Sequence, residues 1–183
     1  MFTSRAGHLP TWGAIVPFVL IFGLIIGDVV ETVSTQTLDV AVAPLLGPQL
    51  DQGRVPFGVV EGGPLGYYLV GYAISTLALL VAASLLAVVA IRFGRQGGVT
   101  RTMARLVEFA LTALILWGVG QFITHMGNNF AANTHDVLAQ WDFMSTIDSQ
   151  AYVLWLLIIS VLSSFVYVFR RSAFLEEEQE GLV

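Results

Sequence analysis

The sequence predicts an all-α integral membrane protein, built as an antiparallel four-helix transmembrane bundle. Of its 183 residues, 56% are hydrophobic and only 11% are charged, whereas an average soluble domain is about 25% charged. Four stretches are long and apolar enough to cross a bilayer. No segment alternates as a transmembrane barrel strand would, so helices must satisfy the backbone hydrogen bonds within lipid.

The four predicted spans follow from the thickness of the bilayer. A helix rises 1.5 Å per residue, so about 20 mostly apolar residues cross a hydrocarbon layer of about 30 Å. We expect a single transmembrane domain over residues 1–183, with spans at 11–30, 67–91, 103–123 and 151–169, external loops at 31–66 and 124–150, and an acidic tail at 172–183. The first span resembles a signal peptide, but no small-x-small cleavage site follows, so we expect a retained helix.

The positions of the arginines predict the orientation, because cytoplasmic loops carry an excess of positive charge. Arginines precede the first span, surround the link between the second and third, and follow the fourth: Arg5, Arg92, Arg95, Arg101, Arg105, Arg170 and Arg171. Only Arg54 falls on the other side. We therefore expect a multi-pass protein of the plasma membrane with both termini in the cytoplasm.

The first external loop has two parts. The residues after Val30 either continue the first helix beyond the membrane or form a short strand at LDVAVA, where apolar residues alternate. From Pro44 to Pro64, proline and glycine recur and predict irregular backbone. This segment is not a phosphate-binding loop, because no predicted strand precedes it and the chain has no lysine.

The segment 124–142 is expected to cap the bundle on its external side. Asn133 is a favourable N-cap, and apolar residues then recur on one helix face at Val137, Leu138 and Trp141. We predict a short amphipathic helix that lies at the external membrane surface between spans three and four. Trp141 would be its interfacial anchor.

The same segment holds candidate metal ligands at His125, His135, Asp136 and Asp142. Nitrogen and oxygen donors suit transition metals, but His135 and Asp142 are at i, i+7, too far apart to chelate one ion directly. Two haem ligands are not expected, since His8 lies across the membrane from the other histidines; a single His125 ligand shared with another subunit is the alternative. We expect no bound metal and no cofactor.

A polar stripe on the third predicted span is the candidate path through the membrane. Glu108 is costly to place in hydrocarbon and is a functional candidate unless it is paired. Arg105 lies three residues earlier on the same face, so an ion pair between the two is expected. Gln121, Thr124 and Asn128 continue the polar residues outward, either as the lining of a pore or as a helix contact.

Small residues predict where helices pack, because they let two backbones approach closely in lipid. The first span carries Gly23 and Gly27 at i, i+4. The second carries a longer stripe at Gly71, Ser75, Ala78 and Ala82.

These observations limit the function. The sequence has no cysteine, and its net charge of −5 argues against a nucleic-acid partner. It shows no catalytic triad, paired carboxylates or nucleotide loop, so we do not expect an enzyme. It favours a non-catalytic subunit or scaffold of a membrane assembly, whose partners are the lipid bilayer and other membrane subunits or copies of itself. The alternatives are a homo-oligomeric channel or small carrier that uses Glu108 and the Gln121 stripe, and, third, a membrane-anchored sensor.

Overall fold

The computed structural model describes residues 12–47, 50, 53–96, 100–144 and 149–180. Its four long helices are α1 (Trp12–Thr35), α3 (Gly63–Gln96), α4 (Arg101–Thr134) and α6 (Ser149–Glu180). The connection from α1 to α3 contains β1 (Thr37–Asp39), α2 (Ala43–Leu46), β2 (Arg54–Pro56) and the 3-10 helix η2 (Phe57–Val60). A short helix, α5 (Leu138–Met144), lies between α4 and α6.

Each long helix contains a segment that is long and apolar enough to cross a membrane, which confirms that part of the prediction. These segments are Ile15–Thr35, Gly63–Arg95, Arg101–Thr134 and Val153–Ser172. The helices α3 and α4 have 34 residues each, about 51 Å at 1.5 Å per residue. Since the hydrocarbon layer is about 30 Å thick, both helices must extend well beyond it, and their boundaries differ from the predicted 67–91 and 103–123.

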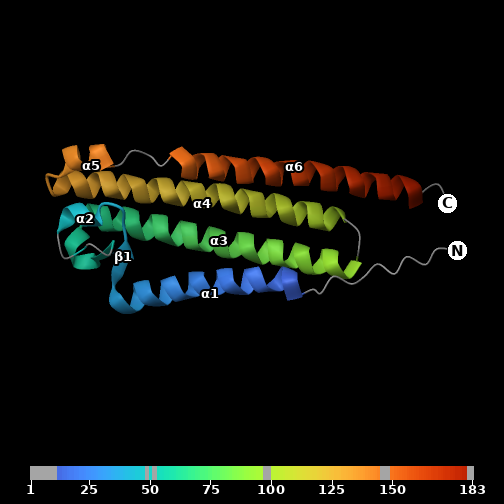
Figure 1. The fold of residues 1–183 in the computed structure, drawn as a ribbon, viewed down its shortest axis with the longest axis horizontal. Helices are drawn as coiled ribbons and strands as arrows, with labels where there is room; N and C mark the ends of the chain where they lie inside the picture. The colour runs from blue at the N-terminus through green and yellow to red at the C-terminus, as the bar shows by residue number, and fades with distance from the viewer. Residues whose placement is uncertain (1–11, 48–49, 51–52, 97–99, 145–148, 181–183) are drawn as a thin grey trace.

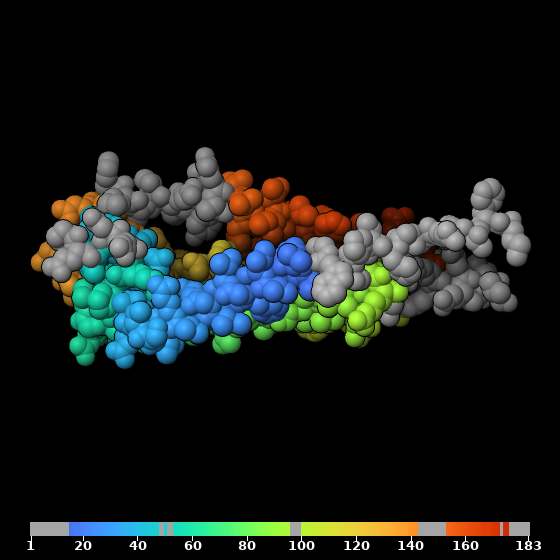
Figure 2. Space-filling view, turned by 60° about the horizontal axis from the view of Figure 1, so that its bottom comes forward, coloured from blue at the N-terminus to red at the C-terminus, as the bar shows by residue number. Residues whose placement is uncertain are grey.

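The four long helices form an open row in the order α1, α3, α4, α6, with successive helices antiparallel (Figure 1). The main contacts join α3 to α4, α4 to α6 and α1 to α3. Figure 2 shows the olive atoms of α4 between the blue atoms of α1 and the orange atoms of α6. The prediction was an antiparallel four-helix bundle; the four helices are present, and they lie side by side as a row. In lipid no hydrophobic force drives α1 and α6 together, so the row can stay open.

The central pair, α3 and α4, packs closely because glycines face each other across the contact. A Cβ built on Gly71 would lie 2.8 Å from the carbonyl oxygen of Gly120, and one built on Gly120 would lie 2.9 Å from the carbonyl oxygen of Gly71. Both distances are too short for a real Cβ. Ala78 and Ala82 are buried further along α3, so small residues determine how near the two helices lie.

The largest buried cluster lies at one end of the row, in a cap formed by the α1–α3 connection, the start of α3, the end of α4, and α5. Its members are Leu38, Val40, Val42, Ala43, Val55, Val60, Tyr68, Ala131, Ala132 and Trp141. Strands β1 and β2 pair antiparallel with Leu38 opposite Val55, which places both side chains in this cluster. The helical continuation and the short strand, which were alternatives for the residues after Val30, both occur in succession.

The opposite end of the row carries most of the arginines, and we call it the arginine-rich end. It contains the start of α1, the end of α3, the start of α4 and the end of α6 (Figure 1). Its described arginines are Arg92, Arg95, Arg101, Arg105, Arg170 and Arg171. The helix α6 runs on to Glu180, so most of the predicted acidic tail continues the helix; residues 181–183 lie outside the described residues, as do residues 1–11.

Candidate functional site

The polar stripe of α4 is used in contacts with α3. The side-chain Nε2 of Gln121 donates to Oγ of Ser75 at 3.2 Å. The hydroxyl of Tyr68 donates to Oδ1 of Asn128 at 3.0 Å, and both side chains are buried. Thr124 donates to a carbonyl oxygen of its own helix. Three of the residues considered for a pore therefore lie along the contact between α3 and α4.

Glu108, the fourth candidate, lies near the arginine-rich end and pairs with a different partner from the one expected. Its carboxylate accepts a hydrogen bond from Nε of Arg170 on α6, and no ion pair joins it to Arg105 among the described residues. The side chain of Glu108 is 29% exposed. Glu108 and Arg170 are 62 residues apart in the sequence, so their ion pair depends on the packing of α4 against α6. The three-residue spacing between Arg105 and Glu108 on one helix gives no information about that packing.

The segment 124–142 differs from the predicted cap because α4 continues through it to Thr134. Asn133 is thus inside α4 and is not the N-cap of the following helix. The chain leaves α4 through a Schellman motif, in which the N–H of Val137 bonds to the carbonyl of Ala132 at 2.9 Å. Asp136 takes the left-handed conformation of this motif, with φ of 57°. Glycine is the usual residue there, so Asp136 gave only a weak signal in the sequence.

Trp141 anchors α5 to the protein itself. Its side chain is 4% exposed and belongs to the cap cluster. Its Nε1 donates to Oδ1 of Asn129 on α4 at 2.6 Å, and its ring lies 5.9 Å from that of His125. The predicted short helix is present, beginning at Leu138, but it packs on α4 through the residue that was expected to face the membrane interface.

The candidate metal ligands are dispersed. His125 contacts Trp141, His135 is the C-cap of α4, and Asp136 and Asp142 are exposed. Within the described ranges, no group of three or more His, Asp or Glu side chains is close enough to hold a metal ion. His8 lies outside the described residues.

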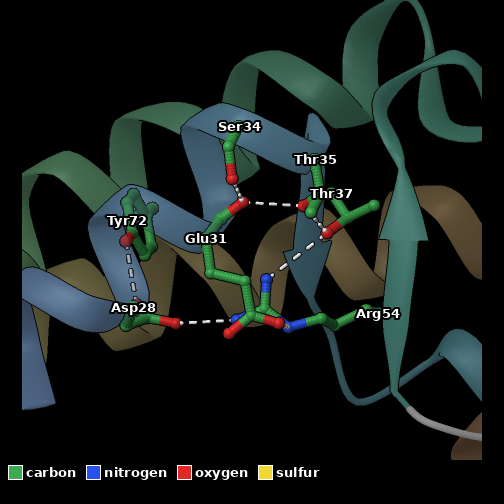
Figure 3. Close-up of polar contacts among 7 residues, drawn as sticks. All are labelled: Asp28, Glu31, Ser34, Thr35, Thr37, Arg54 and Tyr72. Atoms are coloured by element: carbon green, nitrogen blue, oxygen red, sulfur yellow. Dashed lines mark hydrogen bonds and ion pairs between the residues drawn. The ribbon is translucent and has the colours of Figure 1, made fainter.

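A polar cluster that was not predicted from the sequence lies where α1 meets the cap (Figure 3). Arg54 on β2 pairs with Asp28 at 3.0 Å and with Glu31 at 3.1 Å, both on α1. Arg54 also donates to Oγ1 of Thr37 at 3.3 Å, and the hydroxyl of Tyr72 on α3 donates to Asp28 at 2.8 Å. We call these five residues the outer clasp. The sequence could have indicated this cluster, because Asp28 and Glu31 lie three residues apart on one helix face. Arg54 is the lone arginine of the connection from α1 to α3 and is therefore their natural partner.

The two predicted small-residue faces have different surroundings. The stripe of α3 lies against α4, as described above. Gly23 and Gly27 are exposed, and a Cβ built on either would meet nothing within 4 Å. The i, i+4 glycine pair is therefore open on the surface of α1.

Four helices able to cross a membrane place this chain in the class of multi-pass membrane proteins. Comparison with known proteins does not narrow that class: no family model, no curated protein and no solved structure matches the chain.

Proposed function

We propose that the chain is a non-catalytic subunit or scaffold of a larger membrane assembly. The observation that carries this proposal is the open row of helices. In the most apolar segment of α1, only 6% of the residues are buried within the chain. In the corresponding segment of α6, none of the described residues is buried. Both outer helices thus leave a broad face open to lipid or to other subunits.

The open glycine pair of α1 favours a protein partner on that helix. A Cβ at Gly23 or Gly27 would meet no atom within 4 Å, yet glycine in a helix interior costs roughly 1 kcal/mol relative to alanine. In lipid, this spacing lets a second helix approach closely.

The proposed location is the plasma membrane, with both termini in the cytoplasm. The arginine-rich end would be the cytoplasmic one under the positive-inside rule. Arg54, the exception to that bias, is held between two carboxylates of the outer clasp.

A homo-oligomeric channel or small carrier is the second candidate, and the continuous polar residues of α4 are what favour it. It is weaker because Gln121 and Asn128 already bond to α3, and Glu108 already pairs with Arg170. A path through one chain would have to break these contacts.

Native mass spectrometry of the chain, extracted with its surrounding lipid, tests the two candidates. Stoichiometric foreign subunits are the expected result, a closed ring of identical chains would support the channel, and a bare monomer would contradict both. Gly27→Leu should release the foreign subunits without changing the thermal melt of the isolated chain. Ile21→Phe, about a third of a turn round α1 from Gly27, is the matched control and should retain them.

A further inference from the structure

A charged cavity lies between α4 and α6 at the arginine-rich end. It has a volume of about 280 Å³ and is lined by Arg101, Ala104, Arg105, Glu108, Arg170 and Phe174. Three guanidinium groups and one carboxylate give this lining a net charge of +2.

The depth of the cavity coincides with the edge of the apolar segments. On α6 the apolar stretch ends at Phe169, immediately before Arg170, and on α4 the apolar stretch begins at Phe109, immediately after Glu108. In a bilayer this charged lining would sit where hydrocarbon gives way to lipid headgroups. Val89, Met103 and Val107 form a buried cluster against Val166 and Phe169, so α3, α4 and α6 pack together at this end.

Arg170 and Arg105 differ in whether another side chain holds their guanidinium group. Arg170 is held by Glu108, which positions its guanidinium beside the cavity. Arg105 is exposed and makes no hydrogen bond or ion pair with any part of the chain that the structure describes. Arg105 therefore has its full donor capacity available for a ligand.

We propose that this cavity binds the phosphate group of an anionic phospholipid. Guanidinium groups match phosphate oxygens with paired hydrogen bonds, and basic pockets between membrane helices recur as headgroup sites. The start of α4 adds the positive end of its helix dipole. Phe174 and Ala104 complete the lining. This inference is independent of the proposed scaffold role.

The test is a titration of the purified full-length chain in phosphatidylcholine nanodiscs, followed by thermal unfolding. Dioctanoyl phosphatidylglycerol should raise the melting temperature saturably, whereas dioctanoyl phosphatidylcholine and inorganic phosphate should not. Arg105→Gln should weaken the apparent affinity about fivefold, the effect expected for one arginine near a membrane surface. Glu108→Gln should strengthen it, because it removes the one negative charge of the lining while the amide oxygen can still accept the hydrogen bond that positions Arg170.

Arg95→Gln is the matched control, since Arg95 belongs to the same end but not to the cavity lining. Equal losses in Arg95→Gln and Arg105→Gln would overturn the proposal in favour of general charge attraction. An equal response to phosphatidylcholine would also overturn it, and an equal response to inorganic phosphate would assign the cavity to a soluble anion. If Arg105→Gln does not fold, Glu108→Gln decides: unchanged or weaker binding refutes the site.

Discussion

At the scale of single residues, the hydrogen bond between Tyr68 and Asn128 shows how a polar stripe can be structural. Both side chains are buried in or beside the cap cluster, so neither can exchange its partner for water. Removing the Tyr68 hydroxyl would leave the Asn128 oxygen without a donor. An unsatisfied buried polar group costs about 1–3 kcal/mol.

We predict that Tyr68→Phe lowers the free energy of unfolding by that amount, measured by denaturation in detergent. Tyr67→Phe is the matched control, because Tyr67 is 46% exposed and its ring contact with Phe130 survives the change. Equal stability of the two variants would mean that Asn128 faces water, and the pore interpretation of the stripe would regain support.

Trp141 and His135 provide a second contrast between buried and exposed residues. Trp141→Ala should cost about 3–5 kcal/mol, the usual range for a truncated core tryptophan, and should release α5 from α4. His135→Ala should cost less than about 0.5 kcal/mol, because His135 is exposed. Denaturation curves of the two variants measure both effects.

The same preparations check the expected absence of a metal or haem centre. We expect no stoichiometric transition metal by elemental analysis and no Soret absorbance. A metal that is bound at about one per chain, and lost when His125 and His135 are both changed to alanine, would contradict this expectation.

At the scale of helices, the glycines divide into those that set a helix contact and those that do not. We predict that Gly71→Ala destabilises the chain by about 1–3 kcal/mol through overpacking, since the added methyl would clash with the backbone of α4. Gly27→Ala is the control; it meets no atom and should leave the melting temperature unchanged or slightly raised. Thermal melts of the isolated chain compare the two directly, and a similar loss in both would show that α1 packs elsewhere in this chain.

The outer clasp attaches α1, which has few buried residues, to the cap. Exposed ion pairs individually contribute little, and Asp28 and Glu31 are about half exposed. Arg54, however, joins both carboxylates to β2, and Tyr72 adds a bond from α3. The network thus links α1, β1, β2 and α3 through their side chains.

At the scale of the whole molecule, the sequence was sufficient to predict the four spans, because the hydropathy of a segment depends only on the residues within it. It was insufficient for their arrangement. The ends of α3 and α4 extend past the hydrocarbon because the cap cluster packs on them, and a hydropathy window does not register that packing. The partner of Glu108 depended on which helices are neighbours, and the end of α4 depended on Asp136 accepting a left-handed conformation.

The orientation of the row yields the last prediction. Six described arginines lie at one end and Arg54 at the other, so the positive-inside rule places the cap outside and the arginine-rich end inside. The chain has no cysteine, so single cysteines can report each side without background. Glu61→Cys and Ala139→Cys, both exposed in or near the cap, should react with a membrane-impermeant maleimide in intact cells. Thr102→Cys, exposed at the start of α4, should react only after permeabilisation; the reverse pattern would invert the orientation and place the proposed lipid site in the outer leaflet.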